Sequence, residues 1–290
     1  MARQQPRPTG PAPLPPVQRL AIRYAKRGRM RFASHRDISR AVERGVRRAG
    51  LPVAHSAGFS PHPKISYSGG APTGAASEAE FLEISLTAAL DPEAVRLRLD
   101  EALPDGIDVI EVHDLAAAPA QRLEASDWKV VLPGVAPADA AAAVAVFLAA
   151  EHAEVDRRIS NGVRRLDTRA GVVTLELDRR ATADEQPDCA ILRMVVRHMT
   201  PAVRPEDILV ALRQLSALEP ASPAVVTRLA QGPLGDDAAV AVASAAGPGE
   251  SAGEPVAPGP AAPAGLAGPE TLVPATTATE APRADSRGAA

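Results

Sequence analysis

The sequence has a single cysteine, few aromatic residues and no long run of apolar residues. Because Cys189 is the only thiol among the 290 residues, neither an internal disulfide nor a cysteine-ligated zinc or iron–sulfur site can be built from this chain alone. The alanine-rich run 138–150 is well short of the roughly 18 apolar residues that indicate a membrane span. We therefore expect a soluble, cytoplasmic protein that contacts no membrane and holds no cofactor of its own.

Motifs of common enzyme classes are also absent. The sequence contains no Walker loop, no GxSxG nucleophile turn and no GxGxxG dinucleotide motif. One Trp, two Tyr and four Phe do not support the stacked aromatic surface of an RNA-recognition motif. These absences favour a chain that is not an enzyme by itself, and they leave catalysis by a less common constellation open.

The composition of both ends predicts disorder. Residues 1–16 and 236–290 are rich in Ala, Pro and Gly and contain few large apolar side chains, so they cannot bury enough surface to offset chain entropy. The second arm is acidic, with seven Asp and Glu against two Arg. Residues 17–235 remain, which is enough chain for two small domains or one large one.

Charge is distributed unevenly, although the formal net charge is only −3. Residues 17–64 carry twelve Lys and Arg against two acids, a net charge of +10. Residues 65–120 carry eleven acids against two Arg, a net charge of −9. Because a concentrated positive field attracts polyanions whatever the balance elsewhere, the first segment is a candidate nucleic-acid surface.

Hydrophobic periodicity predicts an α+β fold made of two tandem ferredoxin-like units. Residues 17–115 read as β-α-β-β-α-β, the order in which two helices cover one face of an antiparallel sheet, with segment 27–34 as a turn or short strand. A linker at 116–125 leads to residues 126–235, which repeat the pattern with an additional hairpin. In the second unit, a helix over 205–215 is expected to face inward through Ile208, Leu209, Leu212 and Leu215.

One helix of the first unit divides into an apolar face and an arginine face. Ser34 and Asp37 match a capping signal, which predicts a helix over 35–49. At 100° per residue, one side carries Ile38, Val42, Gly45, Val46 and Ala49, and the other carries Arg36, Arg40, Arg44, Arg47 and Arg48. These five arginines and Arg27, Arg29 and Arg31 are candidates for anion or nucleic-acid binding, because guanidinium groups grip phosphate oxygens in pairs. The alternative is a solvated helix face.

His35, His62 and Lys64 are further candidates for binding, and for catalysis if the chain has any. His35 falls in the first turn of the predicted helix, where the dipole favours a neutral imidazole that could act as a general base or simply hydrogen-bond. His62 lies between Pro61 and Pro63 in GFSPHPKIS, so its backbone is restricted, and Lys64 follows two places on. We expect this loop and the helix tip to form two walls of one basic pocket, with a purely structural loop as the alternative.

A metal site is not favoured by the histidine pattern. Three of the six histidines, His35, His55 and His62, fall within 28 residues. No Asp, Glu or Cys stands at ligand spacing in the same stretch, and His55 lies in an apparent strand where it could simply be packed. Contact with a phosphate or a nucleobase is the better interpretation of His62.

The stretch from Arg23 to Ile84 resembles a known family. Its most specific elements are the step from Ser34 into HRDISRAVERGVRRAGLP, the loop GFSPHPKIS and the segment PTGAASEAEFLEI. Weaker similarity through EVDRRISNGVRRLDTRAGVVTLEL to VVTRLAQGPL extends the likeness over about 17–235. The chain is similar to the radical-SAM-linked family, a domain of unknown function that occurs alone or C-terminal to cobalamin-binding radical SAM proteins. His35, Pro61, His62, Pro63 and Lys64 match its pattern, whereas His55 stands where an aromatic residue is more usual.

The resemblance implies a stand-alone member that works with a radical SAM protein in trans. That partner would carry the iron–sulfur cluster, S-adenosylmethionine and cobalamin. The resemblance also implies a link to RNA, with tRNA or rRNA as candidates, and to a ribonuclease of the E/G type. It implies no catalytic residue.

Three functions remain open. The leading hypothesis is an RNA-binding or substrate-presenting module that acts with a radical SAM RNA-modifying enzyme. The second is a metal-independent RNA endonuclease, because tandem ferredoxin-like units with an arginine-rich helix also resemble CRISPR RNA-processing endonucleases of the RAMP type; His35, His62 and Lys64 could then move protons and stabilise charge. The third is a protein-interaction adaptor whose arginine face binds an acidic partner.

Overall fold

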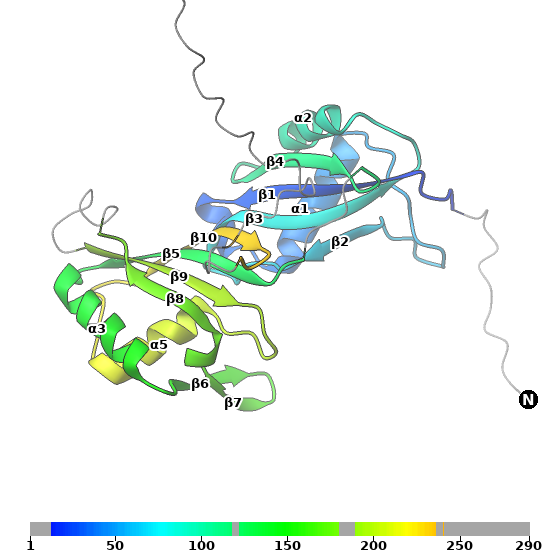
Figure 1. Ribbon diagram of the computed structural model, residues 1–290. Helices are drawn as coiled ribbons and strands as arrows, with labels where there is room; N and C mark the ends of the chain where they lie inside the picture. Colours follow the sequence, from blue (N-terminus) through cyan, green and yellow to red (C-terminus); the bar gives the residue numbers. More distant parts are fainter. Residues whose placement is uncertain (1–12, 118–121, 180–188, 236–239, 241–290) are drawn as a thin grey trace, which may run out of the picture. The chain divides into compact units, whose positions relative to one another are not determined.

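The computed structural model describes residues 13–117, 122–179, 189–235 and 240. The two segments for which the composition predicts disorder, 1–16 and 236–290, lie outside the described residues except for residues 13–16 and 240. The α+β class is confirmed, because the described chain forms a large mixed sheet with four α-helices (Figure 1).

The first half of the chain contributes four strands and two helices to this sheet. The elements are β1 (Gln18–Lys26), the 3-10 helix η1 (Gly28–Phe32), α1 (His35–Arg48), β2 (Ile65–Ser68), β3 (Ala76–Leu86), α2 (Pro92–Ala102) and β4 (Ile107–Asp114). The strands lie in the order β4-β1-β3-β2, and every neighbouring pair is antiparallel. Of the two alternatives for segment 27–34, a turn or a short strand, the structure shows the turn: residues Gly28–Phe32 form the short 3-10 helix η1, which leads into the cap of α1.

The second half repeats this order of elements and adds a hairpin. Its elements are β5 (Ala125–Pro133), α3 (Pro137–Ala149), β6 (Glu154–Ile159), β7 (Gly162–Asp167), η2 (Arg169–Gly171), β8 (Val172–Leu177), β9 (Cys189–Arg197), α5 (Pro205–Ser216) and β10 (Val225–Gly232). The strands lie in the order β10-β5-β9-β8, again antiparallel. Strands β6 and β7 pair only with each other among the described strands and form a separate two-stranded sheet.

A short parallel contact joins the two halves into one sheet. β10 pairs with β5 along its length, and two of its residues also pair with β3, as Thr227 with Ala76 and Arg228 with Ser77. This pairing follows β2 along the same edge of β3, because β2 occupies residues Phe81–Ile84 of that edge. Residues from the two halves are therefore hydrogen-bonded neighbours at this junction.

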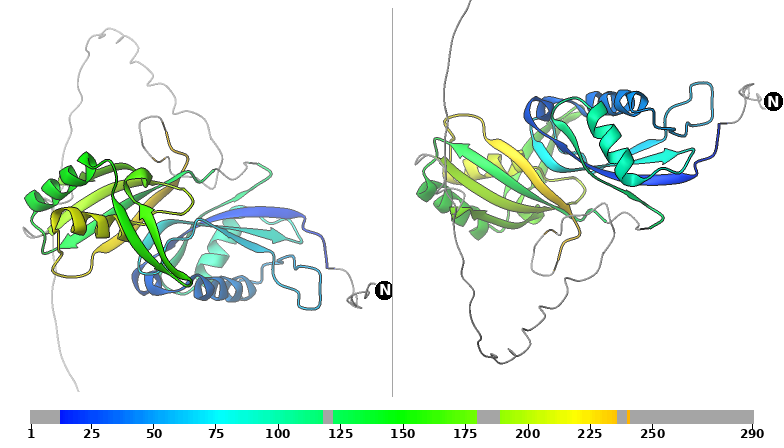
Figure 2. Two further views of the ribbon diagram at one scale, coloured as in Figure 1. Left: turned by 90° about the horizontal axis from the view of Figure 1, so that it is seen from below. Right: turned by 90° about the horizontal axis from the view of Figure 1, so that it is seen from above.

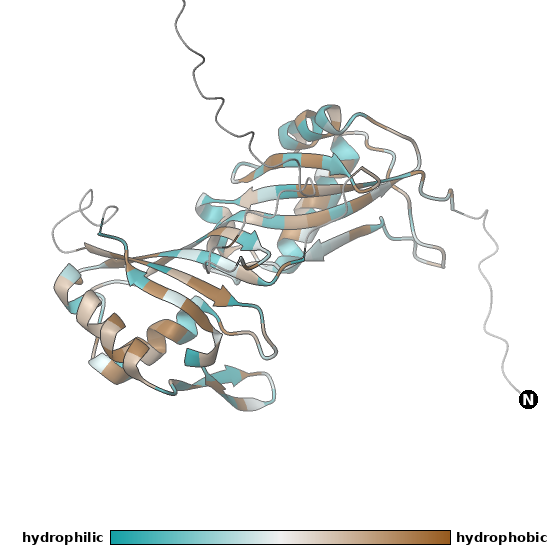
Figure 3. Cartoon of the chain, in the orientation of Figure 1, coloured by the Kyte–Doolittle hydropathy of each residue, from teal (hydrophilic) through white to brown (hydrophobic). Residues whose placement is uncertain are grey.

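Each half has its own apolar core between helices and sheet. In the first half, Val42 and Val46 of α1 and Leu99 of α2 pack on Ile22 of β1 and Ile84 of β3. The second core contains buried residues of α3 and α5 above β5 and β9, among them Phe147, Ile208, Leu132 and Leu192. Figure 2 shows the helices of each half on one face of its strands, and Figure 3 shows the apolar residues along the strands and a hydrophilic β6–β7 hairpin.

The predicted helix faces agree with the structure, with one exception. α1 begins at His35 with a full capping box between Ser34 and Asp37, and Asp91 caps α2. In α5, Ile208 and Leu212 are buried as expected. Leu215, however, is 41% exposed, in the last turn of α5.

Candidate functional site

The arginine face of α1, defined as Arg36, Arg40, Arg44, Arg47 and Arg48, is exposed as the periodicity predicts. The opposite side of the helix is anchored by buried Ile38, Ala41, Val42, Gly45 and Val46, which fixes the rotation of the helix about its axis. Arg48 donates from Nη1 to the carbonyl oxygen of Ala102, at 3.0 Å. Within the described parts of the chain, no ion pair involves the other four arginines.

The three arginines that precede α1 differ from one another. Arg27 is held by two carboxylates: Nε donates to Glu78 at 2.8 Å and Nη1 to Asp108 at 2.9 Å. These bonds, that to Glu78 above all, raise the pKa of Arg27, so it stays charged, and the two carboxylates already balance that charge. The guanidinium of Arg31 lies over the ring of Phe32, 4.5 Å from its centre. Arg29 is exposed. Arg27 is therefore the least available of the predicted anion ligands.

His35 lies at the N-terminus of α1 and close to the start of the linker 69–75. Its exposed ring meets the ring of Tyr67 edge-on, with the ring centres 5.1 Å apart. Burial raises the pKa of Tyr67 to about 12, so its hydroxyl stays protonated at neutral pH. A Cβ built on Gly70 would lie 4.0 Å from His35 Nδ1 and 3.8 Å from Glu80 Oε2. The imidazole thus lies near the junction of the two halves.

The loop with His62 and Lys64 lies at the other end of α1. The amide of Lys64 donates to the carbonyl of Ala54, and Pro63 forms an isolated β-bridge with His55. Ala54 and His55 both belong to the segment between α1 and the loop. His35, by contrast, contacts Tyr67, five residues beyond His62, and five extended residues span about 16 Å. The expectation that the loop and the helix tip form one pocket is therefore wrong, because β2 runs back along α1 between them (Figure 1).

His55 is exposed, and its Nδ1 lies 3.0 Å from the carbonyl oxygen of Val53. The interpretation of His55 as a packed strand residue is thus also wrong. Among the described residues, no three His, Cys, Asp or Glu side chains are close enough together to hold a metal ion. In the same residues, none of the helices has the length and apolar character that crossing a bilayer requires.

A buried cluster of charged and polar side chains lies at the junction, and the sequence interpretation did not find it. Arg228 is 2% exposed and donates from Nη2 to Glu80 at 2.5 Å, from Nε to Ser77 at 3.1 Å and from Nη1 to the carbonyl of Gly69 at 2.6 Å. Gln231 donates to the carbonyl oxygens of Gly69 and Ala79. Burial lowers the pKa of Arg228, and the carboxylate of Glu80 opposes that effect. We call Lys26, Ser77, Glu80, Arg228 and Gln231 the junction cluster.

Lys26 belongs to the junction cluster and not to the exposed basic surface. It is 2% exposed, and its Nζ donates to the carbonyl oxygens of Ala71 and Pro72, at 3.1 and 3.3 Å. Burial lowers its pKa. Lys26 is one of the twelve positive charges counted in residues 17–64, and it holds the linker between β2 and β3 instead of lying on the surface. For Arg228, the sequence signal that could have indicated burial is the alternation along β10, because Arg228 shares a strand face with the apolar residues Val226 and Ala230.

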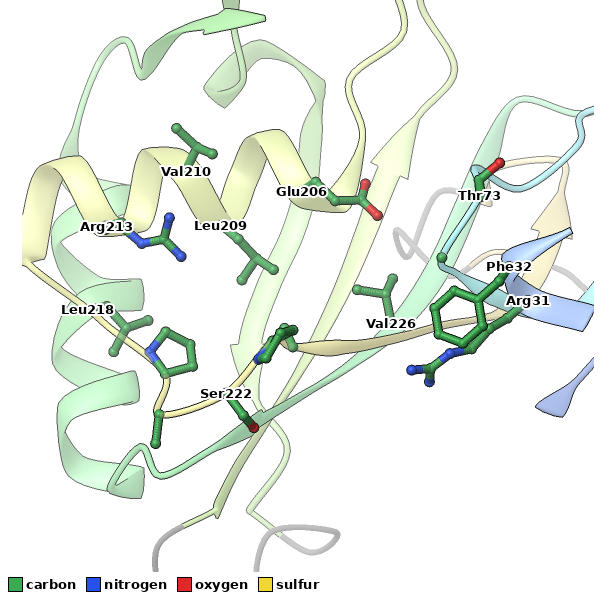
Figure 4. Close-up of a pocket in the computed structure, with 15 residues that line it drawn as sticks. Arg31, Phe32, Thr73, Glu206, Leu209, Val210, Arg213, Leu218, Ser222 and Val226 are labelled. Carbon is green, nitrogen blue, oxygen red and sulfur yellow. The ribbon is translucent and has the colours of Figure 1, made fainter. Parts of the chain in front are cut away.

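A cavity of about 680 Å³ is lined by residues of both halves. One wall is Arg31, Phe32, Thr73 and Gly74; the amide of Gly74 donates to the carbonyl of Arg31 at 2.7 Å, which fixes this wall. The other wall is α5 with Glu206, Leu209, Val210 and Arg213, and Val226 lies between the walls (Figure 4). Burial raises the pKa of Glu206. Nothing in the sequence pattern indicated that Phe32 and Arg213 would face one cavity.

A smaller cavity of about 280 Å³ lies over the junction cluster. Its lining includes Trp128, whose ring lies 5.5 Å from the guanidinium carbon of Arg228. Ser126 Oγ and His198 Nε2 are 2.7 Å apart, and His198 Nδ1 is 3.0 Å from the carbonyl oxygen of Leu123. Since the carbonyl can only accept, Nδ1 carries the proton and Ser126 donates to Nε2. Ser126 is only 2% exposed, so this pair fastens the end of β9 to β5.

Comparison with known proteins places the chain in a family without assigning it a function. No curated protein matches it. One family model, described as "Uncharacterized protein conserved in bacteria (DUF2344)", matches residues 19–205, which include α1, the His62 loop and the strands from β1 to β9 except for the first residue of β1. The chain therefore belongs to this family of uncharacterized conserved bacterial proteins.

Proposed function

We propose that this protein is an RNA-binding module that presents RNA to a radical SAM enzyme acting in trans. The observation that carries the proposal is the arginine face of α1, on which Arg36, Arg40, Arg44 and Arg47 are exposed and form no ion pair among the described residues. A helical face that is merely solvated usually interleaves Glu and Lys. Glu43 forms no ion pair with Arg47 in the described structure, and Asp37, which lies near Arg36 and Arg40, forms no ion pair with either of them.

The spacing of these arginines suits a chain of phosphates. Arg36, Arg40 and Arg44 follow one another at four-residue intervals, which places successive Cα atoms about 6 Å apart along the helix axis. Arginine forks bind phosphate oxygens in pairs, and release of counterions from the nucleic acid supplies much of the affinity. The buried apolar face of α1 holds the helix backbone in place, so the backbone that carries this row of arginines loses little conformational freedom when RNA binds.

We further propose that the two halves are ferredoxin-like units in tandem. The support is that each half has the element order β-α-β-β-α-β, with strand orders β4-β1-β3-β2 and β10-β5-β9-β8, apart from the inserted β6–β7 hairpin. In this assignment α1 and α5 occupy the first and second helix positions of their respective units. The parallel contact of β10 with β3 then joins the last strand of one unit to the central strand of the other.

The partner is proposed from the resemblance to the radical-SAM-linked family. Iron–sulfur cluster, S-adenosylmethionine and cobalamin would all be held by that partner, since Cys189 is the only cysteine of this chain and is buried. The RNA would be a tRNA or an rRNA, and a ribonuclease of the E/G type a further associate. Both proteins would act in the cytoplasm.

The endonuclease alternative is less well supported by the arrangement of its candidate residues. His35, His62 and Lys64 would have to meet at one scissile phosphate. His35 lies at the start of α1, whereas the other two lie beside the segment that follows its end, and His62 is five extended residues, about 16 Å, from the Tyr67 that contacts His35. The adaptor alternative uses the same arginine face with an acidic protein, and it is separated from RNA binding by experiment.

A charge-matched pair of variants tests RNA binding. In the first variant, Arg36, Arg40, Arg44 and Arg47 are replaced by Gln; in the control, four exposed arginines of the second half, Arg158, Arg164, Arg165 and Arg179, are replaced in the same way. Binding of a single-stranded RNA is measured over a range of salt concentrations. If each lost phosphate contact reduces the slope of log K against log salt by about 0.7, the first variant loses about 3 of the slope and the control loses little.

Equal losses in the two variants, or an unchanged slope in the first, would contradict the proposal. Pull-down of the full chain from lysate of its own source, with and without ribonuclease, separates RNA binding from the adaptor role. We expect RNA and a radical SAM protein in the untreated sample. A complex with an acidic protein that persists after ribonuclease, without bound RNA, would support the adaptor instead.

A further inference from the structure

The cavity beside α5 combines an exposed aromatic ring with two arginines. The ring of Phe32 is 59% exposed, and Arg31 covers one side of it at 4.5 Å. Arg213 of α5 lines the same cavity from the opposite wall and is itself exposed. In the part of the chain that the structure describes, neither arginine forms an ion pair. Two positive groups thus converge on one cavity that also offers an aromatic surface.

The shape and lining of this cavity fit a nucleotide. Its volume of about 680 Å³ lies within the 300–1,000 Å³ that is usual for small-ligand sites. Leu209, Val210, Leu218 and Val226 supply an apolar lining, and Figure 4 shows Phe32 and Arg31 on one side of it and Arg213 and Glu206 on the other. Single-stranded RNA is recognised by splayed bases that stack on aromatic rings or guanidinium planes. The Phe32–Arg31 pair provides both kinds of surface.

The remaining polar group of the cavity suits the edge of a base. The carboxyl group of Glu206, at the start of α5, lines the cavity and in Figure 4 extends toward the space between the walls. A carboxylate accepts hydrogen bonds from ring N–H and amino groups of bases. Thr73 and Ser222 add hydroxyl groups that can donate or accept. The cavity therefore offers separate partners for a base face, a base edge and a phosphate.

The cavity also continues the proposed RNA surface. Phe32 ends η1, and only Ala33 and Ser34 separate it from the first residue of α1. We propose that the cavity binds one unstacked nucleotide of the RNA, with its base on Phe32 and its phosphate at Arg213 on the opposite wall, while the flanking strand follows the arginine face of α1. This inference rests on the proposed RNA binding and adds the point at which a single nucleotide is held.

Equilibrium dialysis of the full chain against mononucleotides tests the cavity separately from the helix. The probes are AMP, GMP, CMP and UMP, with inorganic phosphate as the reference ligand. The variants are Phe32→Ala and Arg213→Ala, with Phe59→Ala as the control, because Phe59 is a 71% exposed phenylalanine of the His62 loop that does not line the cavity. The fourfold Gln variant of the arginine face is measured alongside.

We expect at least one mononucleotide to bind about tenfold or more tightly than inorganic phosphate, because base stacking adds to the charge interaction. Phe32→Ala should remove that advantage, Arg213→Ala should weaken binding of nucleotide and phosphate alike, and Phe59→Ala should change neither. The fourfold variant should keep mononucleotide binding while it loses binding of long RNA.

Two results would overturn the inference: mononucleotides that bind no better than phosphate at millimolar concentration, or equal losses in Phe32→Ala and Phe59→Ala. If long RNA still binds in that case, the proposed function stands and only the nucleotide site fails. If mononucleotides bind and long RNA does not, the cavity is a nucleotide site and RNA presentation fails. Circular dichroism of each variant, which should match the unmodified chain because Phe32, Phe59 and Arg213 are all exposed, excludes misfolding as the cause.

Discussion

Arginines occur in two opposite environments in this molecule. On the arginine face of α1 they are exposed, and four of the five have no ion-pair partner among the described residues. In the junction cluster, Arg228 is 2% exposed and bonds to Glu80, Ser77, Gln231 and the carbonyl of Gly69. Arg36, Arg40, Arg44 and Arg47 are free to bind another molecule, whereas the hydrogen bonds of Arg228 are made inside the chain. Arginine is therefore exposed for the proposed RNA binding in one region and stabilises the folded chain in the other.

The junction cluster explains how the linker between β2 and β3 is held. Carbonyl groups of Gly69, Ala71 and Pro72 accept from Arg228 and Lys26, and the amide of Ala71 donates to Glu80 at 3.2 Å. These partners come from β1, β3 and β10, so both halves of the chain contribute. The same linker contains Thr73 and Gly74, which line the large cavity. Buried charge at the junction thus positions one wall of the proposed nucleotide site.

The largest effect is expected from breaking the junction cluster. Arg228→Ala removes the ion-pair partner of buried Glu80, and removal of one partner of a buried pair costs about 3–5 kcal/mol of unfolding free energy. Urea denaturation followed by fluorescence of Trp128 measures the change. Arg193→Ala is the control, because Arg193 pairs with Asp127 but its side chain is 37% exposed, and such a pair is worth about 0–1 kcal/mol. Similar losses in both variants would show that burial does not distinguish the two kinds of arginine.

Periodicity predicted the exposed arginines but not the buried one, for a physical reason. Helix α1 could be assigned from Ser34, Asp37 and the 100° pattern because capping and amphipathicity act over neighbouring residues. The junction cluster depends on pairing between β3 and β10, about 150 residues apart in sequence, and short-range patterns do not report such contacts. Arg228 lies on the same face of β10 as Val226 and Ala230, which is a sign of an inward position, yet no neighbouring residue in the sequence identified Glu80 as its partner.

The candidate site divides in the same way. The arginine face and His35 could be predicted, because one helix carries them. Their relation to His62 could not, since it depends on the direction in which β2 returns along α1 after the loop. The cavity with Phe32 and Arg213 depends on contacts between the two halves, so it became visible only in the folded chain. Long-range arrangement, rather than residue type, limited the prediction.

The two tyrosines report separately on the buried and the exposed region. Tyr24 is buried near Glu80, and its pKa is raised strongly by burial; Tyr67 lies beside His35, and burial raises its pKa to about 12. A folded phenol with a raised pKa keeps its proton after the unfolded chain has lost it, at about pH 10. The stability contributed by these groups is therefore complete below pH 10 and is lost as the pH rises above it.

Phenolate absorbance during an alkaline titration measures this effect. We expect no phenolate near pH 10 in the folded protein and release first from Tyr67. In Tyr67→Phe, the remaining tyrosine should ionise only when the chain unfolds. Absorbance that changes by half near pH 10 while the circular dichroism stays native would contradict the burial of one of the two hydroxyl groups.

The smallest effect is expected at Arg27, which tests whether pairing decides availability. Arg27 is exposed like the arginines of α1, but Glu78 and Asp108 already bind it. Arg27→Gln should therefore leave RNA affinity and its salt slope nearly unchanged and lower the unfolding free energy by at most about 1 kcal/mol, as is usual for exposed ion pairs. Arg44→Gln should do the reverse, with stability unchanged and a loss of about 0.7 in the salt slope. If both variants lost RNA affinity equally, exposure alone would determine binding, and the carboxylates around Arg27 would have to release it when RNA binds.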